Sequence, residues 1–237
     1  MLLKAVRSQR RFEQVAEQVS KLIQKGKLKP GMRLPPEREL ALQLEVSRPT
    51  VREAMIALEI SGLVEVRVGS GIYVIENAKK KLKLSGKLKD IGPGPLELIE
   101  ARKEIEGNNA ALAAQRIDTK CLDEMELAIE KMVSDNLVGA DGDREFHLLI
   151  AKATGNTVLE TITAYLWDQM HSPMWTKLLA LMQENKLHKI VLDDHEHLLE
   201  SFRQKNPKEA QTIMRSHLNH ARDIFFELIG DLENGSP

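Results

Sequence analysis

The sequence predicts a mainly α-helical protein with two domains, an N-terminal winged helix-turn-helix and a C-terminal all-α helical bundle. Three observations lead to this prediction. The 237 residues suffice for two domains of common size. Apolar residues recur at helical intervals along most of the chain, and one stretch near residue 70 alternates as a β-hairpin does. Residues 1–93 carry 19 Lys and Arg against 10 Asp and Glu, whereas the remainder carries 15 against 25.

The first domain, expected over residues 1–76, begins with three helices. Residues 11–26, RFEQVAEQVSKLIQKG, have an apolar residue at every third or fourth position and end on a glycine. A pair of prolines then leads into a second helix that begins near Glu37. Ser47 is placed to cap a third helix, which runs to about Ser61.

A β-hairpin and a linker follow these helices. Residues 63–76, LVEVRVGSGIYVIE, alternate apolar and polar side chains around the turn Gly-Ser-Gly. Residues 77–93 are rich in lysine and contain glycine and proline, which predicts a linker. The second domain, residues 94–237, contains six candidate helices, which begin with LELIEARK, CLDEMEL, DREFHLL, TVLETIT, IVLDDHE and PKEAQTI. A separate helical bundle is the economical interpretation.

The stretch SRPTVREAM, residues 47–55, places two arginines and two hydroxyl side chains at the start of the third predicted helix. In a helix-turn-helix this helix enters the major groove with its N-terminal residues against the bases. Arg48 and Arg52 share one face at i and i+4, and an arginine can grip a guanine with two hydrogen bonds. The alternative is an ordinary N-capped helix whose arginines only face the solvent. Within a complete winged-helix pattern we favour contact with double-stranded DNA.

The stretch LPPERELALQLEVSRPTVREAMIALEISGLVEVRVGSGIYV resembles the winged helix of GntR-type bacterial transcriptional regulators, over about residues 10–76. The resemblance implies that DNA is met by six residues, namely Arg38, Ser47, Arg48, Thr50, Arg52 and, in the wing, Gly69. Pro49 stands where family members often have Thr or Asn, so a side-chain donor is lost at that position.

Four residues of the acidic half carry metal-binding side chains. Asp143 and His147 are four residues apart, and therefore on one face of one predicted helix. His195 and His217 lie on two later helices. One carboxylate and three imidazoles from three helices would surround a divalent cation and leave coordination positions open. This half holds all 7 histidines of the chain. The alternative interpretation is therefore that these histidines are hydrogen-bonded within the protein or exposed to solvent.

The stretches DREFHLLIAKATGN and DHEHLLESFRQKNPKEAQTIMRSHL are similar to the FCD effector domain of the FadR-like branch of GntR regulators. The resemblance implies that Asp143, His147, His195 and His217 hold one divalent metal, with Zn, Ni and Mn not distinguished. It leaves out His197, which shares the DHEH run but would point elsewhere on the helix.

ELIEARKEIEGNNAALAA matches the first helix of the same domain, in which Arg102 is the recurrent cation. Two interpretations of Arg102 are open. Its guanidinium is suited to fork onto the carboxylate of an effector, and it is equally suited to an ion pair with Glu106 at i+4. Asn156 also matches a family position, although a helix C-cap is a simpler role in the turn-prone ATGN.

GPGPLELIEAR and SPMWTKL resemble the corresponding stretches of hexuronate-utilisation regulators. The implied effector is a sugar acid, such as a hexuronate or an aldonate. Trp167 and Trp175 are suited to pack against a sugar face, with core or interface packing as the simpler role. The expected function is that of a DNA-binding transcriptional regulator, a repressor of sugar-acid metabolism genes that a small carboxylate releases from its operator.

Two alternatives to this function stay open at this point. The first is a metal-responsive regulator without an organic effector. The second is a metalloenzyme domain fused to a DNA-binding module, since a metal with open positions can activate water. No motif assigns a general base, so we expect no enzymatic activity.

Composition limits the location and the assembly. No apolar run approaches the roughly 20 residues that span a membrane, and the N-terminal residues lack the apolar core of a signal peptide. The cytoplasm is therefore the expected location. Cys121 is the single cysteine, which excludes an internal disulfide framework. We expect a homodimer, because one winged helix reads only a few base pairs.

Overall fold

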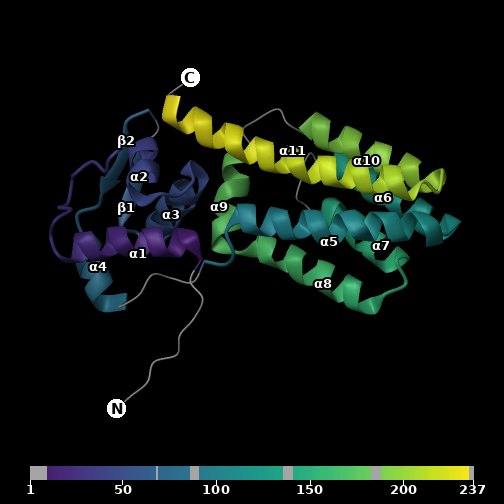
Figure 1. Cartoon of the computed structure of the whole chain (residues 1–237), viewed down its shortest axis with the longest axis horizontal. Helices are drawn as coiled ribbons and strands as arrows, with labels where there is room; N and C mark the ends of the chain where they lie inside the picture. The colour runs from purple at the N-terminus through teal and green to yellow at the C-terminus, as the bar shows by residue number, and fades with distance from the viewer. Residues whose placement is uncertain (1–9, 68, 86–90, 136–140, 183–187, 235–237) are drawn as a thin grey trace, which may run out of the picture. The chain divides into compact units, whose positions relative to one another are not determined.

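The computed structural model describes residues 10–67, 69–85, 91–135, 141–182 and 188–234. The chain forms two compact units, Met1–Gly94 with Ile229–Pro237, and Pro95–Leu228. Within the described residues, no helix combines the length and the apolar character needed to cross a membrane. Both the winged helix-turn-helix and the helical bundle that the sequence predicts are present, which confirms the fold class (Figure 1).

The first unit contains three helices followed by an antiparallel hairpin, in the predicted order. These elements are α1 (Arg11–Gln24), α2 (Glu37–Leu44), α3 (Arg48–Ile60), β1 (Val64–Arg67) and β2 (Gly71–Val74). The apolar stripe of α1 packs against α3. Phe12, Val15 and Val19 of α1 are buried together with Val51 and Met55 of α3, so the hydrophobic effect fixes the helix that presents the candidate DNA contacts.

The start of α3 is set by a side-chain cap, as predicted. Ser47 Oγ accepts a hydrogen bond from the backbone N–H of Thr50 at 3.3 Å. Two residues earlier, Glu45 ends α2 with a left-handed backbone (φ 53°). This conformation turns the chain sharply between α2 and α3 and leaves the first turn of α3 at the surface.

The wing is anchored more firmly than a two-stranded hairpin. β1 and β2 pair with Val64 opposite Val74. The backbone of residues 31–34 adds to the outer edge of β2, through hydrogen bonds from Gly31 N to Val74 O and from Leu34 N to Ile72 O, both 2.8 Å. This isolated bridge, in which Arg33 pairs with Tyr73, was not predicted from the sequence.

The expected linker, residues 77–93, contains a helix, α4 (Ala78–Ser85). Ala78 and Leu82 are buried at i and i+4 and α4 packs against α1. The alternation of lysines with these two apolar residues makes one narrow apolar face, which the high lysine content concealed. Residues 86–90 of the linker lie outside the described residues.

Within the described residues, every regular element of the second unit is a helix or a helical turn. Its elements are α5 (Pro95–Arg116), α6 (Thr119–Asp135), α7 (Asp141–Ala153), α8 (Thr157–Asp168), the 3₁₀ turn η1 (Gln169–His171), α9 (Pro173–Met182), α10 (His188–Arg203) and α11 (Pro207–Asn234). The six predicted helices are confirmed. The sequence prediction missed α9, because PMWTKLLALM is apolar almost throughout and shows no helical period.

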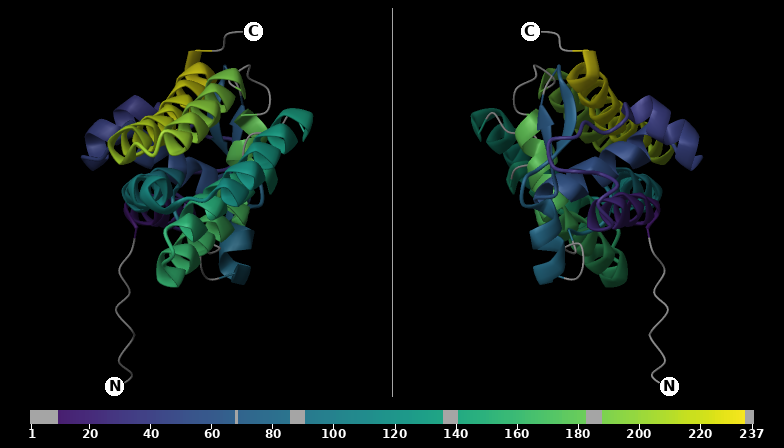
Figure 2. Two further views of the ribbon diagram at one scale, coloured as in Figure 1. Left: turned by 90° about the vertical axis from the view of Figure 1, so that its right-hand side faces the viewer. Right: turned by 90° about the vertical axis from the view of Figure 1, so that its left-hand side faces the viewer.

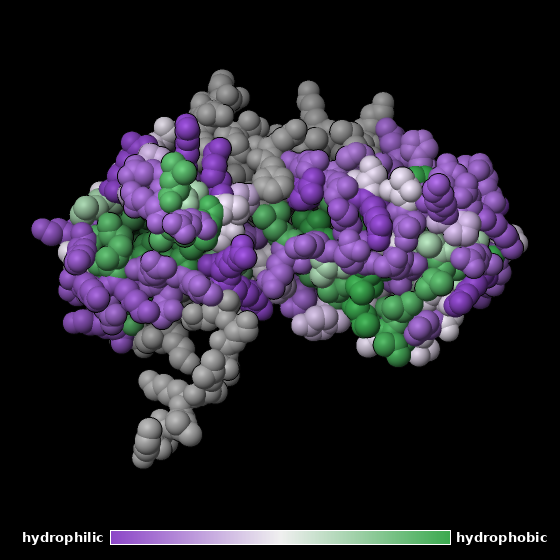
Figure 3. Space-filling view, in the orientation of Figure 1, coloured by the Kyte–Doolittle hydropathy of each residue, from purple (hydrophilic) through white to green (hydrophobic). Residues whose placement is uncertain are grey.

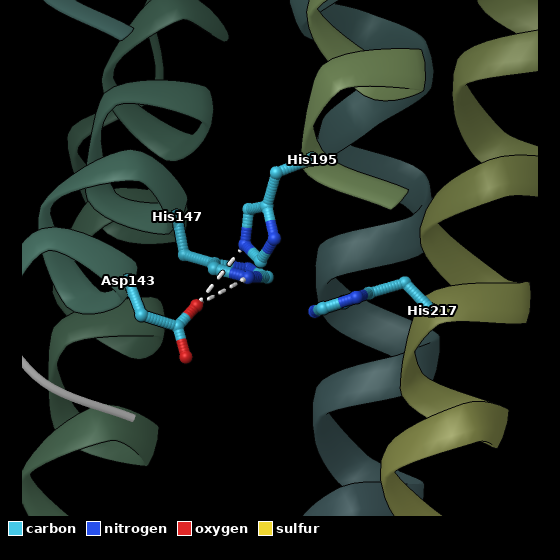
Figure 4. Close-up of side chains that lie close together, drawn as sticks. All are labelled: Asp143, His147, His195 and His217. Carbon is cyan, nitrogen blue, oxygen red and sulfur yellow. Dashed lines mark hydrogen bonds and ion pairs between the residues drawn. The ribbon is translucent and has the colours of Figure 1, made fainter. Parts of the chain in front are cut away.

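Close helix packing places α7 in this bundle. α7 contacts α5, α6 and α8, and a Cβ at Gly142 would lie 2.8 Å from the carbonyl oxygen of Ala128 in α6. Gly142 therefore permits an approach that a side chain would block. Figures 1 and 2 show α10 and α11 running side by side in the same unit. Asp143, which follows Gly142, is thereby brought into the interior, facing α10 and α11 (Figure 4).

Candidate metal centre and nucleic-acid interface

Four buried side chains converge in the interior of the second unit. Asp143 and His147 come from α7, His195 from α10 and His217 from α11, and the four point toward one another (Figure 4). One ligand atom from each lies within 4.8 Å of the others. The structure thus brings together the four residues that the sequence singled out.

The arrangement fits a bound cation better than a set of core histidines whose hydrogen bonds are all made within the protein. Asp143 Oδ1 lies 3.1 Å from His195 Nε2 and 3.3 Å from His147 Nε2. His147 Nε2 is buried, and its partner among the described residues is the carboxylate of Asp143 at 3.3 Å. A cation at the centre would satisfy the imidazole nitrogens and this carboxylate together. Three imidazole nitrogens and one carboxylate make a plausible site for a divalent metal.

Two further carboxylates orient the histidines from behind. Glu106 of α5 contacts His147 Nδ1 through its Oε2 atom. Asp194 Oδ2 lies 3.4 Å from His217 Nδ1 and 2.8 Å from His220 Nδ1. Such contacts fix which ring nitrogen faces a metal and strengthen it as a ligand. From the sequence, Glu106 was expected only as a possible ion-pair partner of Arg102, and Asp194, which directly precedes His195, was not singled out.

The site keeps its carboxylates ionised in spite of burial. Burial would raise the pKa of Asp143, but hydrogen bonds with His147 and His195 hold it well below its ordinary value. Burial likewise opposes the ionisation of Glu106, but the charges of Arg102 and His147 lower its pKa to about 2. Against the effect of burial, the charge of Glu106 and the hydrogen bond with Asp143 raise the pKa of His147. The centre therefore offers negative charge to a cation.

His217 differs from His147, because burial lowers its pKa to about 4. The metal-free protein is therefore expected to lose stability as the pH falls from about 6.5 to about 4. In this window the unfolded chain binds a proton at residue 217 that the folded protein does not bind. The raised pKa of His147 does not make stability depend on pH in this window, because residue 147 is protonated in both the folded and the unfolded chain below pH 6.5.

Urea unfolding in the presence of a chelator, measured across this pH window, tests the expectation. His217→Gln should flatten the decline in the free energy of unfolding, whereas His197→Gln, on an exposed position of α10, should leave it unchanged. Equal declines in the wild type and His217→Gln would assign the acid sensitivity to other groups.

Arg102 lies beside the metal centre and is almost fully buried. Its Nε atom is 2.6 Å from Glu106 Oε1, which is the ion pair that one of the two sequence interpretations described. Its guanidinium lies 4.1 Å from the ring centroid of Trp167, and the Trp167 ring lies 5.0 Å from that of His147. A cation and an aromatic face therefore adjoin the four convergent residues.

The structure corrects the role of Asn156. It is an N-cap and not a C-cap, because its Oδ1 atom accepts hydrogen bonds from the backbone N–H groups of Val158 and Leu159 at the start of α8. Gly155 takes the left-handed conformation (φ 67°) that follows the end of α7. Asn156 therefore belongs to the next helix.

Four of the six expected DNA contacts are exposed. Arg38 stands in the first turn of α2, Ser47 and Arg48 at the start of α3, and Gly69 at the tip of the wing with φ 67°. Thr50 is half-buried, and its hydroxyl lies 2.8 Å from Ser47 Oγ. Ser47, Arg48 and Thr50 thus stand at the N-terminal end of α3, where a groove-reading helix presents its contacts.

Arg52 has a different environment from Arg48. It is only 4% exposed, and its Nε atom lies 2.6 Å from Oε1 of Glu37, which is also 4% exposed. The prediction that the two arginines share one face of the helix did not foresee this buried ion pair. The pairing forms because Glu37 begins α2 and faces α3 across the turn.

Arg52 nevertheless lines a hollow of about 280 Å³ between the start of α2 and the wing. The same hollow is lined by Arg38 and Gly69 and by two arginines that sequence analysis passed over, Arg33 and Arg67. Arg67 also lies over the Tyr73 ring, 4.6 Å from its centroid. Such a concentration of guanidinium groups attracts phosphate.

Two family models match the chain. The model described as bacterial regulatory proteins, gntR family, matches residues 11–74, and the FCD domain model matches residues 97–220. The second match includes all four convergent residues and Arg102. Both matches agree with the resemblances seen in the sequence.

Similar proteins cover nearly the whole chain. The Uxu operon transcriptional regulator of Escherichia coli (strain K12) is 36% identical over 94% of this chain and 90% of its own length. The Exu regulon transcriptional regulator of the same organism is 33% identical over 94% and 87%. A solved GntR family regulator from Pseudomonas syringae pv. tomato str. DC3000 has a TM-score of 0.52, covers 95% and 88%, and is 23% identical, which shows the shared fold.

Proposed function

The chain belongs to the gntR family of bacterial regulatory proteins and carries an FCD domain, and from this premise we propose that it represses sugar-acid metabolism genes and leaves its operator when a small carboxylate binds. Members of this family are DNA-binding transcriptional regulators and not enzymes, so the metalloenzyme alternative is abandoned. We further propose residues 1–76 as the DNA-binding domain, 77–93 as the connection and 94–237 as the effector and dimerisation domain. Binding to chromosomal DNA would place the protein in the cytoplasm.

The convergence of Asp143, His147, His195 and His217 is the observation that carries the effector proposal. These residues would hold one divalent metal, with Zn, Ni and Mn all compatible with three nitrogens and one oxygen. The bound metal would supply a positive charge and open coordination positions for an effector carboxylate. Arg102 adds a second cation beside this centre, and Trp167 supplies an aromatic face.

The sugar-acid class rests on the relatives and on this chemistry. Similar regulators are named for the Uxu operon and the Exu regulon, in agreement with the resemblance to hexuronate-utilisation regulators. A hexuronate carries a carboxylate and several hydroxyls, which suit a metal, a guanidinium and an aromatic ring held close together.

One observation favours a regulator that responds to metal alone. The guanidinium of Arg102 is already compensated by Glu106, so an organic carboxylate would have to share it. Fluorescence anisotropy on a labelled operator, located by mapping bound genomic fragments, separates the two functions. We expect release by a hexuronate in the presence of metal and no release by metal alone. Release by metal alone would establish the alternative.

For the DNA interface we propose that Arg48 reads base edges and that Arg38, Ser47 and Thr50 contact the backbone or bases near the start of α3. Arg52 would reach DNA from the floor of the hollow beside Arg38. The wing would bring Gly69 to the minor groove, where a glycine permits close backbone approach. The net positive charge of residues 1–93 supports this assignment.

A homodimer on a pseudo-palindromic operator is expected, since adequate specificity needs two half-sites related by the dimer axis. Exposed apolar side chains support the pairing of two copies: α8 exposes Val158, Ile162 and Tyr165 at i, i+4 and i+7, and Figure 3 shows apolar residues over this helix. Sedimentation with operator DNA should give two chains per duplex. A stable single chain on the full operator would contradict the proposal.

A further inference from the structure

We infer that Glu106 is a positioning residue that couples ligand binding at Arg102 to metal binding at His147; this inference rests on the proposed metal and effector function. Glu106 is 1% exposed and divides its carboxylate between the two partners. Oε1 accepts from Arg102 Nε at 2.6 Å, and Oε2 contacts His147 Nδ1. A second Arg102 nitrogen, Nη2, donates to Oε2 at 3.3 Å.

Toward the metal, Glu106 selects the tautomer of His147. A carboxylate accepts hydrogen bonds and cannot donate them when ionised, so it retains the proton on Nδ1. Nε2, which lies 3.3 Å from Asp143 Oδ1 inside the convergent cluster, is then the nitrogen that gives up its proton when a metal binds. The contact thus selects Nε2 as the metal-ligating atom of His147.

Toward the effector, Glu106 keeps Arg102 in place and compensates its charge. A ligand carboxylate that forks onto Arg102 must therefore share the guanidinium with Glu106 or replace it. The negative charge of Glu106 is then less compensated by Arg102 and acts more strongly on His147. Ligand binding should consequently strengthen metal binding, and by thermodynamic reciprocity metal should strengthen ligand binding by the same factor.

Glu106 differs in this respect from the other carboxylate behind the cluster. Asp194 lies against His217 and His220, and none of its contacts within the described part of the chain involves Arg102. Both carboxylates orient an imidazole, but Glu106 alone of the two also holds the candidate effector cation. Coupling is therefore assigned to Glu106.

The first test measures Zn²⁺ affinity by competition with a chromophoric chelator. Glu106→Gln should weaken Zn²⁺ binding by about 10–100-fold, the usual effect of removing a group that orients a metal-bound histidine. Glu104→Gln, the same change at an exposed position of α5, should bind as the wild type does. If Glu106→Gln does not fold, judged by circular dichroism, Glu106→Asp should show a smaller loss.

A second test separates positioning from a structural role. In ¹⁵N spectra of the metal-free protein, recorded at a pH at which the His147 ring is neutral, the ring should be the Nδ1–H tautomer in the wild type and a mixture of tautomers in the glutamine variant. Arg102→Met should change Zn²⁺ affinity by one factor in the wild type and by another in the Glu106→Gln background. The two factors should differ by at least about threefold, because the effects of substitutions within one network are not additive.

The outcomes distinguish this inference from the proposed function. A wild type that binds no Zn²⁺ would overturn both. A wild type that binds Zn²⁺, with unchanged affinity in Glu106→Gln or Glu106→Asp, would overturn the role of Glu106 alone. Equal effects of Arg102→Met in the two backgrounds would show that Arg102 and the metal are not joined through Glu106.

Discussion

His195→Ala is expected to remove tight binding of a divalent metal and the response to effector together, while operator binding persists. His195 is fully buried and its Nε2 atom lies 3.1 Å from Asp143 Oδ1. Because the ligands come from α7, α10 and α11, a bound metal would join three helices. A metal at 100 times its dissociation constant stabilises the folded state by about 2.7 kcal/mol, and this increment should vanish in the variant.

Elemental analysis and thermal unfolding with and without added metal measure this effect. The relevant quantity is the rise in melting temperature that metal produces, because removing a buried imidazole also lowers the stability of the metal-free protein. His197→Ala is a matched control, since His197 lies two residues further along α10 and is exposed. It should keep the metal, the thermal increment and the effector response.

Operator binding should survive in His195→Ala because the candidate DNA contacts lie in the other compact unit, Met1–Gly94. An effector changes DNA affinity only if it binds the DNA-free arrangement more tightly than the DNA-bound one. Without the metal this difference in affinity is lost and the variant should remain on its operator. A wild type purified without chelator that contains no metal, yet responds to a sugar acid, would contradict this model and leave Arg102 as the main anchor.

The parts of the fold that follow local rules could be predicted from the sequence. Ser47 caps α3 through a contact three residues away, and the alternation around Gly69 specifies a hairpin. Asp143 and His147 share a face because a helix repeats every 3.6 residues. For His195 and His217, spacing indicated only a possibility, and the family resemblance selected them.

The missed features depend on contacts between distant segments or on apolar runs without a period. The β-bridge at residues 31–34 needs the wing as its partner, and α9 is apolar almost throughout. The contact of Glu106 with His147 joins residues 41 positions apart, which no local pattern reveals. Arg52 was expected at the surface beside Arg48, but its helix packs against α2, and Glu37 pairs with it.

Arg48→Ala and Arg52→Ala are expected to have different consequences. Arg48 is exposed at the first turn of α3, so its loss should reduce discrimination between operator and random DNA by about 1–3 kcal/mol with little change in stability. Arg52→Ala should also reduce discrimination, and in addition it leaves Glu37 buried without its cation. Breaking a buried ion pair in this way typically destabilises a protein by about 3–5 kcal/mol, which is a large share of an ordinary folding free energy.

Anisotropy titrations on operator and scrambled duplexes, together with urea unfolding, resolve the two effects. Arg52→Lys is the informative control, because it keeps a cation near Glu37 and loses the planar fork that can grip a guanine. We expect this variant to recover most of the stability and little of the discrimination. Equal losses on operator and scrambled DNA for Arg48→Ala would mean that Arg48 touches only phosphate. An Arg52→Ala protein as stable as the wild type would mean that the pair with Glu37 contributes nothing to folding, and that Arg52 is held near the hollow for DNA alone.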